Sequence, residues 1–425
     1  MHQSVAKQNP KATNYGQSSG VRSLNPRHHH ALALTSNAGH NVNMVRSPLI
    51  LVFLLWCAGL GAAGQFSKLS LVFPQLETIY GGGQSTPMLG FLVSLISVLG
   101  IIFGLTAGLI VARAGFRKML LAALALGAGI SLIEAAIPPL PAMLALRLLE
   151  GASHLIIVVA APTLIAQITA TRFLPVAMTL WSTFFGVAYA LTAWFGEPLV
   201  ATHGVPSIFY VHAAWMLAIT ALLFVALPRD APQETSRITN VLRQHLTIYS
   251  NPATAAPALA WLCYTLTYVS LLTVLPPLIA PEYRTLTIGL MPLAGIVTSM
   301  TIGVLLQRLL SPVPVVIIGF AIAAFITVGF FIAPASPVLC VALFASLGLV
   351  QGANFAAIPV LNTTATDRAH ANGAVAQMGN LGNTFGTPIA LGMIGVMGFG
   401  GLIAFTLAAY MLGIAAHIIL GKMRN

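Results

Sequence analysis

Long apolar segments separated by short polar ones make up most of the chain after residue 48. A helix needs roughly 20 consecutive apolar residues to cross the hydrocarbon layer of a membrane. Proline-rich and polar stretches such as "IPPLPA" and "APASP" mark the breaks between segments. The pattern predicts twelve spans: 49–73, 87–111, 118–137, 141–169, 175–200, 205–227, 254–279, 286–309, 314–334, 337–363, 372–397 and 399–421.

One long polar break divides the spans six and six. Residues 228–253 form this break, and "RITNVLRQHLTIY" within it has apolar residues at helical spacing. We interpret that stretch as a surface helix that links two bundles, rather than as a binding element. The prediction is an all-α integral membrane protein with six-helix bundles at 49–227 and 254–421, a cytoplasmic central loop, and a cytoplasmic carboxyl terminus at 422–425.

Composition supports a membrane protein. The 425 residues are 57% hydrophobic and only 6% charged, and a soluble domain could not bury that much apolar surface. Residues 1–48 are polar and lack Asp and Glu, so we predict a disordered basic cytoplasmic tail, with Met44 as an alternative start. The "HHH" at 28–30 has no further ligand motif around it, and we predict no metal site. The three cysteines lie in apolar segments and are interpreted as packing residues.

The basic residues predict the orientation. With the amino terminus inside, 16 of the 19 Lys and Arg residues fall in inside segments. Outside loops hold only Arg284, and two more cations, Lys68 and Arg147, lie within spans. This positive-inside bias predicts both termini in the cytoplasm. We expect the chain to lie in a bacterial inner membrane. The net charge of +11 is spread over membrane loops, so no nucleic-acid partner is expected.

The two halves echo each other. Gly108 stands five residues before Arg113, and Gly303 stands five residues before Arg308. "EGAS" at 150–153 is matched by "QGAN" 201 residues later. Repeats of six spans are typical of secondary transporters that are built from two bundles around a central site.

"GLIVARAGFRKML" at 108–120 resembles the signature of the major facilitator superfamily between the second and third helices, Gly-x-x-x-Asp-Arg-x-Gly-x-Arg. The Asp position is Ala112 here, and the resemblance therefore implies a weakened latch between the bundles on the cytoplasmic side. It also implies a gating role for the matching loop residues and their counterpart in the second half: Gly108, Arg113, Gly115, Arg117 and Arg308.

"LALRLLEGASH" at 144–154 resembles the same superfamily's fourth-helix motif, Leu-x-x-Arg-x-x-Gln-Gly, with Glu150 in the Gln position. "GQFSKLSLVFPQL" and "TLWSTFFG" are similar to the cyanate-permease-like branch. The resemblance covers 49–421. It implies alternating access by two rocking bundles, a small-molecule substrate and no cofactor.

Ionisable residues inside spans are costly and normally face a cavity or a partner. At about 100° per residue, two narrow polar stripes emerge on the first and fourth spans. We interpret both stripes as cavity walls. Their members are Gly61, Gly64, Gln65 and Lys68 on the first span, and Arg147, Glu150, Gly151 and His154 on the fourth.

Lys68 and Arg147 are predicted to share one depth, each about 8–9 Å from the outer face. Three interpretations are open: contact with a substrate anion, with Gln65 beside them; a structural ion pair with Glu150; or snorkelling of the cations to the outer interface. We take the first as the leading hypothesis for substrate binding.

Glu150 and His154 are the candidates for proton coupling, because a carboxyl in a dry cavity and a histidine both titrate near neutrality. The alternative is that Glu150 neutralises Arg147 permanently and that His154 is a packed core residue. Glu134 and Glu197 fall near the outer ends of their spans, and we expect both to be solvated.

The second half has no charged residue deep in a span, and amides take their place. Asn354, Gln377 and Asn380 are predicted substrate contacts, with hydrogen bonds between helices as the alternative. The leading function is proton-coupled transport of a small organic solute, an anion, by a monomer in the bilayer. The alternative is a proton-driven exporter of amphipathic drugs or metabolites. The sequence has no P-loop, metal-ligand cluster or nucleophile elbow, so an enzyme is not expected.

Overall fold

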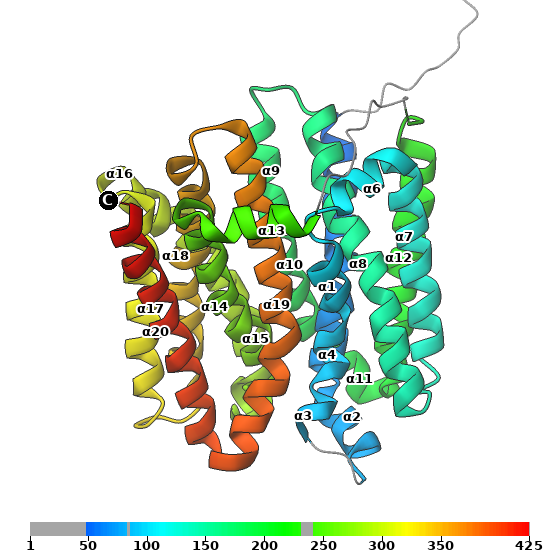
Figure 1. The fold of residues 1–425 in the computed structure, drawn as a ribbon. Coiled ribbons are helices and arrows are strands. Elements are labelled where there is room, and N and C mark those ends of the chain that lie inside the picture. Colours follow the sequence, from blue (N-terminus) through cyan, green and yellow to red (C-terminus); the bar gives the residue numbers. More distant parts are fainter. Residues whose placement is uncertain (1–47, 83–85, 231–240, 425) are drawn as a thin grey trace, which may run out of the picture. The chain divides into compact units, whose positions relative to one another are not determined.

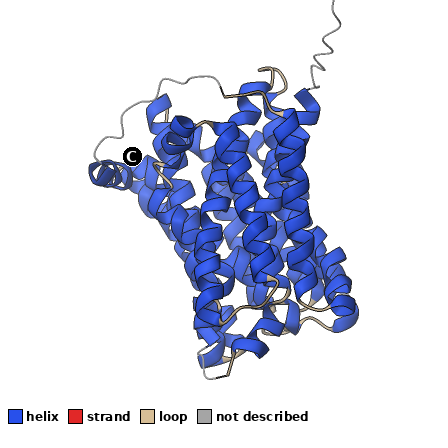
Figure 2. Cartoon of the chain, turned by 90° about the vertical axis from the view of Figure 1, so that its right-hand side faces the viewer, coloured by secondary structure: helices blue, strands red, loops and turns tan. Residues whose placement is uncertain are grey.

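The computed structural model describes residues 48–82, 86–230 and 241–424, and throughout these ranges the regular structure is helical (Figure 2). These residues belong to one compact unit, which begins at Arg46. The predicted tail, the alternative start at Met44 and the "HHH" lie outside the described residues. The bundle boundaries remain predictions.

The first half begins most of its long helices at or next to a proline. Proline fits the first turn of a helix because the N–H that it lacks has no partner there. The helices are α1 (Pro48–Leu71), α2 (Phe73–Tyr80), α3 (Thr86–Leu89), α4 (Phe91–Ser94), η1 (Leu95–Ser97), α5 (Val98–Phe103), α6 (Ala107–Ala114), α7 (Phe116–Glu134), α8 (Leu140–Ile168), α9 (Leu174–Ser182), α10 (Phe184–Leu191), η2 (Thr192–Gly196), α11 (Glu197–His203) and α12 (Pro206–Ala226).

The second half follows after α13, which occupies the central polar segment as the sequence predicts. Its elements are α13 (Val241–Ser250), α14 (Pro252–Val274), η3 (Pro276–Leu278), α15 (Pro281–Thr298), η4 (Ser299–Gly303), α16 (Val304–Leu309), α17 (Pro312–Gly329), α18 (Pro337–Leu361), α19 (Ala365–Met397) and α20 (Phe399–Arg424).

Eleven helices of the described residues are long and apolar enough to cross a membrane. They correspond to eleven of the twelve predicted spans, and short helices such as α3 to α5 join into single spans. The twelfth prediction, 372–397, falls within α19, which begins earlier and is 33 residues long. Its Asn, Gln and Thr residues make α19 less hydrophobic than the other eleven, although it packs against α14, α20 and the α3–α5 segment.

The helix bundle has two ends, which we call the α13 end and the α11 end. The α13 end carries α13, the α6–α7 turn and the carboxyl terminus, and the α11 end carries α2, α3 and α11 (Figure 1). The positive-inside bias predicts that the α13 end is cytoplasmic.

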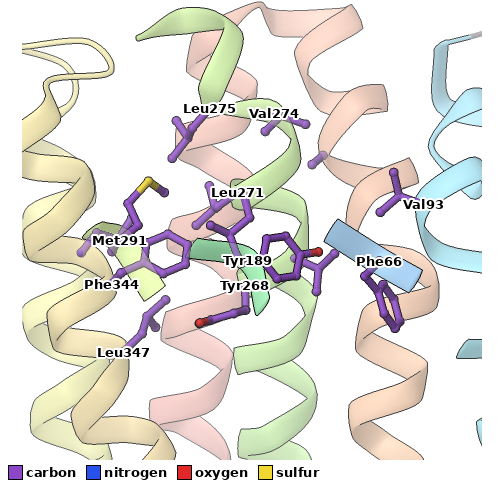
Figure 3. Packing of buried hydrophobic residues seen from close by; sticks show 14 of the residues in the cluster. Phe66, Val93, Tyr189, Tyr268, Leu271, Val274, Leu275, Met291, Phe344 and Leu347 are labelled. Atoms are coloured by element: carbon purple, nitrogen blue, oxygen red, sulfur yellow. The ribbon is translucent and has the colours of Figure 1, made fainter. Parts of the chain in front are cut away.

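An apolar cluster joins the two halves. Figure 3 shows Tyr189 from the first half beside Tyr268 from the second, with Phe66 and Phe344 on either side of them in the same cluster. Phe185 provides the link, because its ring stacks on Tyr189 at 5.3 Å and meets Tyr268 edge-on at 6.1 Å. Aromatic pairs of this kind stabilise the protein beyond the contribution of the apolar area that they bury. They fill the interior between the halves, next to the cavity that lies between them.

Candidate functional site

A buried cluster of four charged side chains lies inside the first half. Lys68 on α1 donates all three protons of its ammonium group: to Glu134 Oε2 on α7 at 2.6 Å, to Glu150 Oε1 on α8 at 2.7 Å and to Ser131 Oγ at 2.7 Å. Lys68 is 1% exposed and both glutamates are 0% exposed. The ammonium therefore has no donor left for a solute.

Arg147 completes the cluster. Its Nη1 donates to Glu134 Oε1 at 3.4 Å and to Glu150 Oε2, so each cation contacts both carboxylates. Its Nε donates to Leu92 O at 2.7 Å and its Nη2 to Gln65 O at 2.8 Å. We call Lys68, Glu134, Arg147 and Glu150 the charge quartet. Its formal charges sum to zero, as a fully buried ionic group requires.

The quartet corrects one expectation from the sequence. Glu134 is not solvated, because the side chain points into the bundle toward Lys68 and is fully buried. The ion pair of Arg147 with Glu150 was one of the open interpretations, and the structure contains it with Glu134 added. A signal existed in the sequence: Ser131 and Glu134 lie three residues apart on one helical face, at the predicted depth of Lys68.

A histidine that the sequence did not single out extends the quartet. His212 on α12 contacts Gly61 O through Nε2 at 2.9 Å and Ser131 Oγ through Nδ1 at 2.7 Å. A carbonyl oxygen only accepts, so Nε2 carries the proton, and in the neutral ring Nδ1 is the acceptor. Ser131 therefore donates to His212 and accepts from Lys68, and the hydrogen bonds run in one direction from Lys68 to His212.

Three further members of the two stripes, Gln65, Gly151 and His154, are packed rather than open. Gln65 donates to Ser153 Oγ at 2.8 Å. His154 contacts Ala62 O through Nδ1 at 3.1 Å, and its ring meets Phe66 edge-on at 5.1 Å. A Cβ on Gly151 would collide with the Ile96 carbonyl oxygen. The stripe on the fourth span is thus a packing surface in this structure, and the proton-coupling role of His154 stays a prediction.

The larger cavity, of about 470 Å³, lies between the halves at the α11 end. Hydroxyl groups form part of its wall: Ser70 Oγ lies 3.1 Å from Tyr189 Oη and 2.9 Å from Thr273 Oγ1, and Ser67 Oγ lies 2.7 Å from Thr192 Oγ1. These contacts join α1 to α10, η2 and α14. Neither Lys68 nor Arg147 lines this cavity.

Two residues of opposite charge line the same cavity: Glu197 from α11 and Arg284 from α15. Both are half-buried, so Glu197 departs in part from the expected solvated position. The sequence did not single out Arg284, because a lone basic residue in an outside loop carries no signal of its own.

A second, smaller space lies within the first half. It measures about 330 Å³ and reaches Lys68, His212, Gly61 and Gly64. Most of its wall is apolar and includes Phe195, which is 69% exposed. Three members of the predicted first-span stripe thus line a space in the structure, and that space adjoins the outer surface of the first half.

The predicted amides of the second half make hydrogen bonds within the protein. Asn354 Nδ2 donates to Pro257 O at 3.1 Å, and its Oδ1 is buried without a partner. Asn380 Nδ2 donates to Ala376 O at 2.8 Å, and a Cβ on Gly100 would collide with its amide. These contacts fit the helix-packing alternative, and the substrate-binding assignments stay predictions.

Gln377 links three segments at the α13 end. Its Nε2 donates to Ile101 O of α5 at 2.8 Å and lies 2.9 Å from His245 Nε2, and its Oε1 accepts from Tyr249 Oη at 2.8 Å. Burial raises the pKa of Tyr249 to about 12, so the hydroxyl remains a donor at physiological pH. Gln377 therefore connects the two halves and α13, which crosses beside α14 and α19 (Figure 1).

The loop of the predicted signature is held by its own half. Gly115 has a φ of +96°, and a Cβ there would also strike Asp230. Asp230 accepts from the backbone N–H groups of Arg117 at 2.8 Å and Lys118 at 3.1 Å, which caps the start of α7. The Arg117 side chain donates to Leu227 O at 3.1 Å and to Phe224 O at 2.6 Å.

Arg117, which was predicted to act in gating, contacts its own half of the protein. It binds the end of α12 there, and Asp230 places a carboxylate at the loop in which Ala112 replaces the expected Asp. Of the other predicted gating residues, Gly108, Arg113 and Arg308 are exposed. The gating role of all five stays a prediction.

The described residues contain eleven helices that are long and apolar enough to cross a membrane, and they form two packed halves with a cavity between them, which indicates a multi-pass membrane protein. The family model of the Major Facilitator Superfamily matches residues 51–387, well over half of the chain. The chain belongs to this superfamily, and it is a secondary transporter rather than an enzyme. A comparison with curated proteins gives no match.

Proposed function

We propose that this transporter moves a small organic solute with an anionic group by proton-coupled alternating access. The observation that carries the proposal is the charge quartet, which places two carboxylates, Glu134 and Glu150, in the dry core of one half. A proton bound by either carboxylate would change the net charge of a group that is buried from water, and such a change is what proton coupling requires.

The quartet supports coupling through its charge balance. With both carboxylates ionised, its net charge is zero; one added proton leaves it at +1. The larger cavity lies on the other side of α1, since Ser67 and Ser70 line it while Lys68 belongs to the quartet. For an assumed separation of about 10 Å and an effective dielectric constant of about 20, an anion would stabilise that added charge by about 1.7 kcal/mol. A bound anion then favours protonation by more than tenfold.

In this proposal Lys68 and Arg147 hold the two carboxylates rather than the solute. All three N–H groups of Lys68 and most of those of Arg147 donate within the protein. Of the two cavities described above, Lys68 lines the smaller one and Arg147 lines neither. We place the solute in the larger cavity. We further propose a monomer in a bacterial inner membrane with both termini in the cytoplasm. The positive-inside bias supports the position of the termini.

A thermal-shift screen of the purified protein tests the solute. The panel holds small carboxylates, inorganic anions including cyanate, and lipophilic cations. A ligand at about 100 times its Kd stabilises by about 2.7 kcal/mol. Stabilisation by lipophilic cations alone would instead favour the drug-export alternative.

Proteoliposomes test the coupling. A pH-sensitive dye trapped in the vesicles reports whether the stabilising solute carries protons with it. Glu150→Gln should keep solute exchange across the membrane and lose proton movement, whereas Glu282→Gln, at an exposed position, should behave like the unaltered protein. Proton movement that persists in Glu150→Gln contradicts the role of this carboxylate.

A further inference from the structure

The larger cavity carries one positive and one negative side chain that do not pair with each other. Arg284 and Glu197 both line it. Among the described residues, no ion pair within 4.0 Å joins the Arg284 and Glu197 groups. Two opposite charges that line one cavity and do not pair with each other are each available to water or to a solute that matches both.

Arg284 keeps donors for a solute. Its Nε and Nη2 donate to Ile279 O at 3.3 and 3.1 Å, and Nη2 also lies 3.4 Å from Pro277 O. These carbonyl groups fix the guanidinium at the end of α14, and in the described residues Nη1 makes no hydrogen bond with the protein. A planar guanidinium with free N–H groups is the side chain best suited to a carboxylate.

Glu197 is held from the opposite half. Its Oε2 accepts from Thr285 Oγ1, and Thr285 is the residue next to Arg284. This hydrogen bond brings the carboxylate of α11 to the same part of α15 as the guanidinium, and leaves Oε1 with no hydrogen-bond partner among the described residues. A carboxylate with a free oxygen in a half-buried position binds an ammonium group.

We propose that the larger cavity binds a zwitterionic solute, with its carboxylate on Arg284 and its ammonium group on Glu197. A simple anion would bind Arg284 but would be repelled by Glu197. A simple amine would bind Glu197 but would be repelled by Arg284. The volume of about 470 Å³ admits a small amino acid together with several water molecules. Because the two residues come from different halves, the solute would bridge the halves at the α11 end.

This inference rests on the proposed function, since it names the solute class for the same cavity. It is tested by binding alone, with no proton gradient. The probes are γ-aminobutyrate, butyrate and butylamine, which share one carbon chain and differ only in their charged groups; β-alanine, propionate and propylamine form a shorter series. Thermal shift against concentration gives Kd for each probe on the purified full-length protein.

The expected result is that a zwitterion binds at least tenfold more tightly than its matched anion and amine. Arg284→Gln and Glu197→Gln should each weaken that binding at least tenfold, while Glu282→Gln and Arg308→Gln, at exposed positions, should leave it unchanged. Equal binding of butyrate and γ-aminobutyrate, unaltered binding in Glu197→Gln, or no binding of either zwitterion would each overturn the assignment.

The two proposals fail separately. If the zwitterion binds but carries no protons into proteoliposomes, the coupling is wrong and the site stands. If another solute moves with protons and Glu197→Gln has no effect on it, the transport function stands and the zwitterion site is wrong. Glu150→Gln should retain zwitterion binding in either case, because Glu150 does not line the cavity.

Discussion

Glu134→Gln separates the sequence-based expectation from the structure most sharply. The change keeps the shape of the side chain and removes one negative charge from the charge quartet. Glu134 Oε2 lies 2.6 Å from Lys68 Nζ, and Oε1 lies 3.4 Å from Arg147 Nη1. At an effective dielectric constant of about 20, these attractions are worth about 6 and about 5 kcal/mol. Most of that sum is offset by desolvation, and breaking a buried pair typically costs about 3–5 kcal/mol.

The assay is thermal unfolding of the purified protein in detergent. A loss of about 4 kcal/mol corresponds to a fall of about 5 °C in the midpoint for a chain of this size. Glu282→Gln is the matched control, because its side chain is exposed and such changes stay within about 0.5 kcal/mol.

A double variant shows whether charge balance is the cause. Lys68→Met combined with Glu134→Gln removes one charge of each sign and leaves Arg147 paired with Glu150. It should be more stable than the sum of the two single changes predicts, by about 1–3 kcal/mol. If Glu134→Gln shifts the midpoint no more than Glu282→Gln does, Glu134 is solvated and the quartet is refuted.

Three further outcomes are expected. Asp230→Ala should lower stability by about 1 kcal/mol through loss of the α7 cap, and an unchanged melting midpoint would show that its carboxylate does not cap the helix. Gln377→Ala removes the hydrogen bonds that link the two halves to α13. It should raise several-fold the labelling of a cysteine introduced by Ala371→Cys, measured with a membrane-impermeant maleimide in inside-out vesicles. Unchanged labelling would contradict the link. Gly348→Ala should cost about 1–3 kcal/mol, since its Cβ would collide with the α15 backbone, whereas Gly400→Ala, with open space around it, should melt as the unaltered protein does.

Local pattern alone was enough for the helices and their order. A run of some 20 apolar residues can satisfy its backbone in lipid only as a helix, and the predicted spans agree with the observed helices to within a few residues at most ends. The same logic placed the surface helix α13 in the central polar segment. The motifs at 108–120 and 144–154 also identified the family correctly, because a family signature is a short stretch of residues that can be read without the tertiary structure.

Partners across helices depended on the tertiary structure. Helical spacing placed Arg147 and Glu150 on one face, but it could not show that α7 turns Glu134 toward them or that Ser131 joins Lys68 to His212. The packing of a helix against its neighbours sets its rotation about its own axis. The hydropathy pattern of the sequence does not show this rotation. An ionisable residue near a span end therefore looks the same in sequence whether it faces water or the core.

The larger cavity likewise depends partly on the sequence pattern and partly on the tertiary structure. The sequence determined that this chain is a membrane carrier of twelve predicted spans with cations in its first half. Only the folded chain decided which charges meet: it closed Lys68 and Arg147 into a neutral quartet and brought Arg284 and Glu197, 87 residues apart, to one cavity. Apolar patterning acts within one helix at a time, whereas a binding site is made by the distances between side chains of different helices.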